Sequence, residues 1–190
     1  MDTMMRSDSF ELAAALFPGE EWIPYEEGIF VAKSRLAGGR REQDKLRQEI
    51  FDVHILTGRG SVAYFLPERE KDGEVHCSHA DTVIDGEVVE LKTVSGNRAT
   101  LGKSFRRGYK QGRSLLRTHG VEADHSVFLR LYTPFSVESV RAKLAGELKN
   151  TTGHGRSICS FEASGELFFW DYDELRAIVG AMDNGAPHGE

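Results

Sequence analysis

The dipeptide Asp85-Gly86 lies between two apolar runs and restricts the fold more than any other feature of the chain. Asp-Gly in this setting is a strong signal for a two-residue β-hairpin with a type I′ turn, because both turn residues must adopt positive φ. The sequence therefore predicts antiparallel strands over about residues 77–84 and 87–94.

Counting outward from the turn places Asp81 opposite Glu90. Because successive side chains alternate between the faces of a strand, one face of the hairpin carries four polar side chains: His79, Asp81, Glu90 and Lys92. Opposed like charges destabilise a strand pair by up to about 1 kcal/mol, or the two carboxylates share a proton. Valines cover the hairpin around these carboxylates, so we expect the pair to have a cationic partner.

A hard divalent cation, Mg²⁺ or Mn²⁺, is the partner that fits this pair. Such an ion takes one or two carboxylates, keeps several waters and uses a substrate phosphate as a further ligand. It also lowers the pKa of a bound water. Asp81 and Glu90 are thus predicted metal ligands, and Lys92 is expected to orient the water or neutralise developing charge. The alternative is a surface hairpin whose charges face water.

The spacing of these residues resembles a known nuclease motif. Asp81, followed after eight residues by Glu90-Leu91-Lys92 at the end of an apolar strand, resembles the core of the PD-(D/E)XK nuclease superfamily. In that superfamily the D and the ExK carry the metal and the catalytic lysine. Ala80 precedes Asp81 where the motif's name has proline. The resemblance covers roughly residues 40–132 and implies a restriction-endonuclease-like fold and metal-dependent cleavage of DNA or RNA.

The resemblance also implies a further acid on the helix that precedes the hairpin. Glu49 is the preferred residue, with Glu42 and Asp52 as alternatives. Within the superfamily, the string ADTVIDGEVVELKT followed by a basic helix is similar to toxin nuclease domains of bacterial contact-dependent inhibition systems. Several of those domains cut tRNA, which implies tRNA as a substrate and an immunity protein as a partner.

A strongly basic helix is predicted directly after the hairpin, over about residues 103–118. The chain has a net charge of -6, yet residues 91–121 hold eight bases and no acid. Helical spacing places Phe105, Tyr109 and Leu116 on the face that packs on the sheet. The predicted nucleic-acid-binding residues are Lys103, Arg106, Arg107, Lys110, Gln111 and Arg113 of this helix, with His79 of the hairpin. A solvated basic face is the alternative.

Hydrophobic periodicity and turn signals predict the remaining elements. Helices are expected over 9–17, 40–57 and 137–150 and at the C-terminus, and strands within 22–34 and over 61–67, 125–132 and 166–172. Residues 151–160 are expected to form a polar loop, and Phe168, Phe169 and Trp170 to be core residues. The fold class is α/β (α+β), a single domain with a mixed sheet flanked by helices. Segment 1–39 is expected to pack on a nuclease core of residues 40–190.

Two other functions and several exclusions follow from the composition. A metal-independent toxin ribonuclease would use His79, Lys92 and a residue such as Arg106 for acid–base chemistry, and an inactive nucleic-acid-binding module would only bind. Two cysteines cannot form a disulfide framework or an all-cysteine zinc site. No apolar stretch approaches the roughly 18 residues of a membrane span, and no secretory signal is visible. We therefore expect a cytoplasmic protein, with delivery into another cell as a further possibility.

Overall fold

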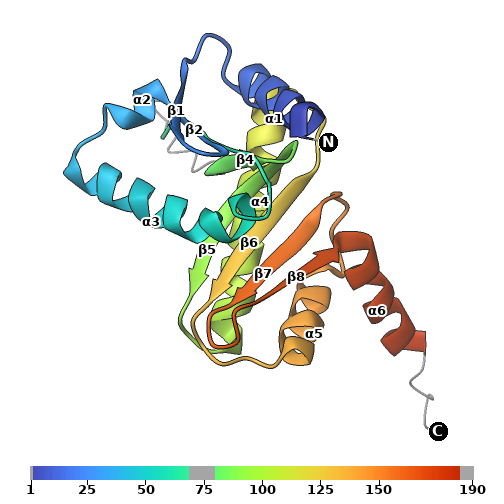
Figure 1. The fold of residues 1–190 in the computed structure, drawn as a ribbon. Coiled ribbons are helices and arrows are strands. Elements are labelled where there is room, and N and C mark those ends of the chain that lie inside the picture. The colour runs from blue at the N-terminus through green and yellow to red at the C-terminus, as the bar shows by residue number, and fades with distance from the viewer. Residues whose placement is uncertain (1, 69–79, 185–190) are drawn as a thin grey trace, which may run out of the picture.

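The computed structural model describes residues 2–68 and 80–184 and builds one mixed sheet with helices on both faces (Figure 1). The eight strands follow one another across the sheet in chain order. They are β1 (Trp22–Glu26), β2 (Ile29–Ala32), β3 (Ala63–Phe65), β4 (Thr82–Ile84), β5 (Glu87–Val94), β6 (His125–Leu131), β7 (Arg156–Phe161) and β8 (Glu166–Asp171). The helices are α1 (Asp2–Leu16), α2 (Lys33–Leu36), α3 (Arg40–Thr57), α4 (Arg98–His119), α5 (Val137–Leu148) and α6 (Tyr172–Asn184). The predicted mixed α/β class is confirmed.

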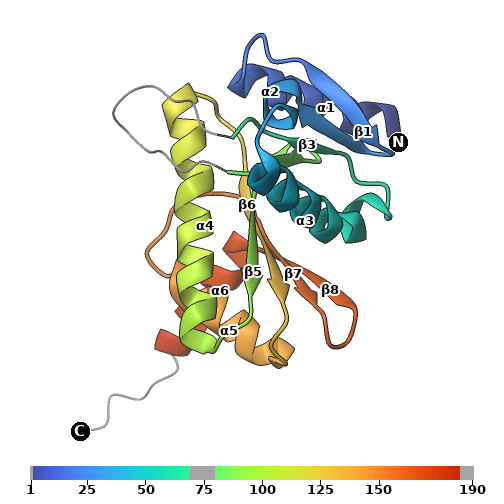
Figure 2. The ribbon, with the colours of Figure 1, turned by 90° about the vertical axis from the view of Figure 1, so that its left-hand side faces the viewer.

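Strand direction explains where the long helices lie. Strands β3, β4 and β5 form an antiparallel meander, whereas the pairs β2–β3, β5–β6 and β6–β7 are parallel. A parallel pair needs a crossover connection, which α3, α4 and α5 supply in turn. Helices α3 and α4 lie on opposite faces of the sheet, as Figure 2 shows with the sheet between them.

Alternation along β5 divides its side chains between two separate cores. Val89 and Leu91 pack with Leu46 and Ile50 of α3. Val94 packs on the other face, in the cluster that contains Phe105 of α4. The intervening Glu90 faces the same side as Val94, so the predicted catalytic carboxylate points at α4.

Two helices are longer than the sequence predicts. α1 begins at Asp2 rather than near residue 9, and α4 begins at Arg98 rather than near residue 103. The Asn97 side chain accepts hydrogen bonds from the backbone N–H groups of Ala99 and Thr100. This residue therefore caps the helix, and residues 98–102, which lie before the predicted start, belong to α4.

The predicted loop at 151–160 is wrong over its second half. Arg156–Phe161 is β7, an interior strand between β6 and β8. The core prediction for the following strand is correct for Trp170, which is 6% exposed, but not for Phe169, which is 44% exposed. Strands β3 and β4 are shorter than expected, and residues 77–79 of the predicted hairpin lie outside the described residues.

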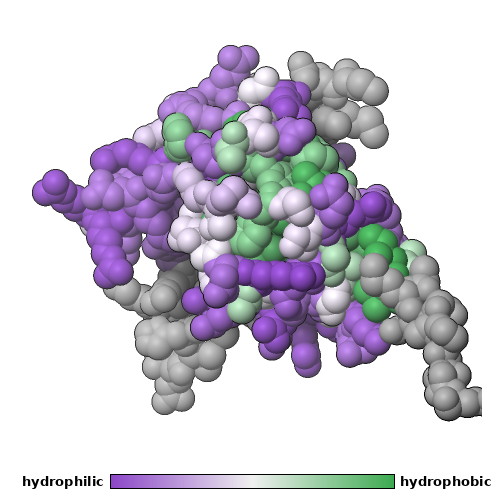
Figure 3. Space-filling view, turned by 90° about the horizontal axis from the view of Figure 1, so that it is seen from below, coloured by the Kyte–Doolittle hydropathy of each residue, from purple (hydrophilic) through white to green (hydrophobic). Residues whose placement is uncertain are grey.

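The face of the molecule seen from below is mostly polar. Seen from below, hydrophilic side chains surround a smaller apolar area (Figure 3). Across residues 2–68 and 80–184, no helix is both long and apolar enough to cross a membrane.

Candidate active site

The hairpin forms in the predicted register, but its ladder ends early. Ile84 pairs with Glu87 and Thr82 with Val89. The turn residues Asp85 and Gly86 have φ angles of 50° and 81°, as a type I′ turn requires. β4 then stops at Thr82, so the next residue, Asp81, does not continue the ladder opposite Glu90.

At the end of the ladder, the side chain of Asp81 takes the place of a backbone partner for β5. Its Oδ2 accepts a hydrogen bond from the Leu91 backbone N–H at 3.1 Å. Its own carbonyl oxygen accepts from the Leu66 N–H at 3.0 Å. The Asp81 carboxylate is therefore fixed beside the middle of β5, next to Glu90, although the two residues are not a strand pair.

Glu90 is a buried carboxylate with an incomplete set of partners. Its side chain is 2% exposed. Oε1 forms an ion pair with the Lys92 ammonium, whereas no donor among the described residues reaches Oε2. Burial, and then the negative charge of Asp81, raise the pKa of Glu90 to about 8, against a smaller opposite effect of Lys92. In the metal-free protein this environment therefore favours a proton or a cation on Glu90.

Helix α3 supplies a third carboxylate, Glu49. Its side chain is 10% exposed, and burial raises its pKa, to which the charge of Asp81 adds. Each carboxylate oxygen already has a cation: Oε2 pairs with Arg35, and Oε1 lies 3.2 Å from the Lys45 ammonium. The predicted helical acid thus lies at the site, held by two side chains of the protein.

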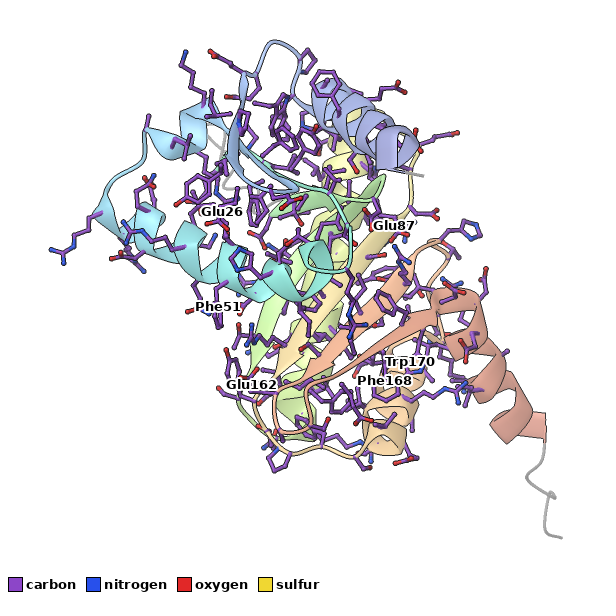
Figure 4. All side chains as sticks on the ribbon, in the orientation of Figure 1. Glu26, Phe51, Glu87, Glu162, Phe168 and Trp170 are labelled. Carbon is purple, nitrogen blue, oxygen red and sulfur yellow. The ribbon has the colours of Figure 1, made fainter. Side chains whose placement is uncertain are left out.

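The two alternatives to Glu49 have other roles. Glu42 accepts the Gly39 backbone N–H at 2.7 Å and so caps α3. Asp52 lies 2.9 Å from Arg130 of β6, whose guanidinium also pairs with Glu162 and stacks on Phe51. Phe51 and Glu162 are labelled in Figure 4. The Asp52–Arg130 pair connects α3 to the sheet outside the carboxylate cluster.

Three further residues complete the cluster, and the sequence did not indicate them. The Arg35 side chain is 2% exposed and donates to the carbonyl oxygens of Leu66 and Asp81, at 3.2 and 3.1 Å. Lys45 lies 2.7 Å from Glu68. The i,i+4 spacing of Lys45 and Glu49 was a signal for one contact, whereas nothing in the sequence marks Arg35 as buried.

Helix α4 closes the other side of Glu90. An added Cβ at Gly108 would lie 2.9 Å from Val127 Cγ1 and 3.3 Å from Glu90 Cγ. Gly108 therefore marks a close approach of α4 to the sheet. This approach brings the backbone of α4 directly over the buried carboxylate.

The predicted basic stripe faces solvent along α4. A depression of about 490 Å³ is lined by Lys103, Arg106, Arg107, Lys110, Gln111 and Ser114. Gln111 is buried, while Arg113 is exposed beyond the depression. Arg106 lies in a segment without acidic residues, yet it pairs at 2.8 Å with Glu147 from another helix, α5. His79, the remaining predicted contact, lies outside the described residues.

A metal ion fits only part of the predicted ligand set. In the part of the chain that the structure describes, no group of three or more His, Cys, Asp or Glu side chains is arranged to hold a metal. Asp81 and Glu90 are adjacent carboxylates, and Glu90 Oε2 is an oxygen without a donor. Mg²⁺ needs no more than one or two carboxylates from a protein, so this pair fits the ion, while Glu49 is already neutralised.

No protein-family model, curated protein or solved structure matches this chain. A function for the site therefore has to follow from its geometry and charge.

Proposed function

We propose that the protein is a metal-dependent nuclease of the PD-(D/E)XK type that hydrolyses phosphodiester bonds of DNA or RNA. The buried Glu90 carboxylate carries the proposal, because its Oε2 has no donor and its neighbour Asp81 is a second carboxylate. A buried carboxylate is tolerated when a cation or a proton neutralises it. A metal ion that binds both the carboxylate pair and a substrate phosphate would account for this arrangement, whereas a purely structural hairpin would not require it.

Asp81 and Glu90 would hold Mg²⁺ or Mn²⁺. The bound ion supplies a water of lowered pKa and stabilises charge on the phosphate. The Leu91 N–H fixes the orientation of Asp81 through Oδ2, and the other oxygen, Oδ1, lies 3.6 Å from the Lys45 ammonium. Arg35 fixes the backbone of the same residue through its carbonyl oxygen.

Lys92 has a role that depends on Glu90. In the metal-free protein its ammonium is paired with Glu90 Oε1. A cation on Glu90 would share the carboxylate charge and so weaken that pair, which would free Lys92 to orient the attacking water. The water oxygen would bond to phosphorus as the bond from phosphorus to the leaving oxygen breaks, while the water gives up a proton to solvent and the leaving oxygen takes one up.

The depression on α4 would hold the sugar–phosphate backbone. Lys103, Arg107 and Lys110 are exposed along one side of the helix, and rows of such side chains bind phosphates without reading sequence. Gly108 lies on the same helix against Glu90. One helix therefore carries both the depression and the packing contact with Glu90, which supports a role for α4 in bringing bound phosphates toward the carboxylate pair.

The order of elements supports the assignment to this superfamily. α3, β3, the β4–β5 hairpin and α4 follow the order that the sequence resemblance implies: a helix with an acid, a strand, the hairpin and a basic helix. The resemblance to contact-dependent inhibition toxins makes tRNA the first RNA to test and an immunity protein the partner to seek.

The decisive experiment compares cleavage by the wild type, Asp81→Asn, Glu90→Gln and Lys92→Met. Substrates are single- and double-stranded DNA and tRNA, each with Mg²⁺, Mn²⁺ or EDTA. We expect metal-dependent cleavage that falls by about 100-fold or more in each variant. Glu122→Gln changes an exposed acid in the connection between α4 and β6 and should cleave like the wild type. Circular dichroism establishes that each variant is folded.

Two outcomes would contradict the proposal. Cleavage that survives EDTA would favour the metal-independent ribonuclease. Salt-sensitive binding of nucleic acid by folded protein, without cleavage under any metal, would favour the inactive binding module.

A further inference from the structure

Three carboxylates from three segments of the chain converge on one ammonium group, that of Lys45. Its Nζ lies 2.7 Å from Glu68, 3.2 Å from Glu49 and 3.6 Å from Asp81. The Lys45 side chain is 53% exposed, whereas those of its three partners are only 25, 10 and 13% exposed. The ammonium therefore covers a recess of carboxylates from its solvent side.

The cluster divides into a neutralised half and an open half. Glu49 has Arg35 on one oxygen and Lys45 on the other. Glu68 has Lys45 at 2.7 Å and Arg35 at 3.6 Å. Glu90 has Lys92 on Oε1 and no donor on Oε2 among the described residues. Glu90, beside Asp81, is thus the carboxylate of this cluster at which a further cation would bind.

The two cations of the neutralised half differ in how firmly they are held. Arg35 is buried and donates to two backbone carbonyl groups as well as to Glu49. Lys45 has a flexible stem and only side-chain partners in the cluster. Lys45 is therefore the cation that could be exchanged, and Arg35 belongs to the fixed frame.

We propose that the Lys45 ammonium holds the position of a second metal ion, so that the site takes up a single divalent ion, on Asp81 and Glu90. This inference rests on the proposed function. A second divalent ion between Glu49 and Asp81 would have to displace Lys45 or lie against its like charge. Glu49 is then a positioning residue that holds Lys45 and Arg35 in place, rather than a metal ligand.

The test counts bound ions in a Mn²⁺ titration, followed by calorimetry and by the electron paramagnetic resonance signal of free Mn²⁺. The wild type should bind one ion at the site, and Lys45→Met, which removes the charge but keeps the length, should bind two. Lys33→Met is the matched control, since Lys33 is 64% exposed and paired at 2.5 Å with Glu21 outside the cluster. This control should bind one ion.

Two ions at the wild-type site, or a single ion in Lys45→Met, would overturn the inference. If metal-dependent cleavage accompanies either result, the proposed function survives and only the role of Lys45 is lost. A wild type that binds no ion and does not cleave would overturn both. Should Lys45→Met unfold in the absence of metal, Lys45→Gln takes its place, and the wild-type count remains decisive.

Discussion

Replacing Glu90 by glutamine should stabilise the metal-free protein at alkaline pH. The buried Glu90 carboxyl has its pKa raised from 4.5 to about 8, first by burial and then by the charge of Asp81. Because its folded pKa lies above its unfolded pKa, the stability it contributes is fully present below about pH 4.5 and is lost as the pH rises through about 8. Above that pH the fold has to bury an ionised carboxylate, whereas glutamine stays neutral.

The shift sets the size of the effect. A difference of about 3.5 pKa units, at about 1.4 kcal/mol each, gives an upper limit of about 5 kcal/mol. Part of this is offset, because Lys92 loses the partner that it has on Oε1. We therefore expect Glu90→Gln to gain a few kcal/mol relative to the wild type between pH 5 and pH 9.

The measurement is urea unfolding of the wild type and Glu90→Gln in EDTA at pH 5, 7 and 9, followed by circular dichroism. Glu122→Gln is the control and should change the free energy of unfolding by no more than about 0.5 kcal/mol at each pH. Added Mn²⁺ should stabilise the wild type at pH 9 and have little effect on Glu90→Gln. A difference between wild type and Glu90→Gln that is the same at all three pH values would refute the reasoning.

Three other substitutions test the packing and the charges around the site. Gly108→Ala should lose about 1 to 3 kcal/mol of stability, because its Cβ would lie 2.9 Å from a valine methyl group of β6. The control Gly146→Ala on α5 has open space around the new methyl group and should gain up to about 1 kcal/mol. Equal effects of the two substitutions in thermal unfolding would contradict the close approach at Gly108. Arg130→Met should lose about 3 to 5 kcal/mol because it leaves the buried Asp52 without its cation, and the double variant with Asp52→Leu should recover part of that loss in urea unfolding. Lys110→Gln should weaken binding of all nucleic-acid sequences alike and reduce the slope of log affinity against log salt by about 1; an unchanged slope in fluorescence anisotropy would remove this residue from the interface.

The parts of the site that could be predicted are those that local chemistry determines. The Asp-Gly turn requires two positive φ angles, and both are present. That turn sets the hairpin register, and alternation along β5 places Glu90 and Lys92 on one face of the strand. Helical periodicity likewise identified α3 and the buried face of α4, because both depend only on spacing along the chain.

The start of α4 and strand β7 were not predicted, because polar residues there cap a helix or bond to neighbouring strands. Asn97 was taken as a loop residue, yet its side chain satisfies two backbone N–H groups at the start of α4. Arg156 and Ser157 make the beginning of β7 look like a polar loop. In the structure the Arg156 backbone N–H donates to Ser126 and its guanidinium lies 3.0 Å from Glu87, so pairing with neighbouring strands determines its conformation.

The other charged residues of the cluster could not be predicted for a related reason. Arg35, Lys45 and Glu68 reach the site from segments that meet only after β2 pairs with β3 and α3 packs on the sheet. Each of these residues taken alone has the sequence context of a solvated side chain. Their grouping is a property of the topology and not of any one stretch of sequence.

The cost of Glu90 to the metal-free fold is itself an argument for function. An apolar residue at this position on β5 would remove a buried carboxylate with an oxygen that lacks a donor and would spare the repulsion from Asp81. The protein instead surrounds the pair with cations that neutralise the neighbouring acids and leave this one incomplete. Local rules of stability are broken in this way where the missing partner arrives from outside the chain. A divalent cation held by Asp81 and Glu90 would replace the proton on Glu90, so the pH of that exchange should lie below the pH at which the wild type loses stability without metal, and it should fall further as the metal concentration rises.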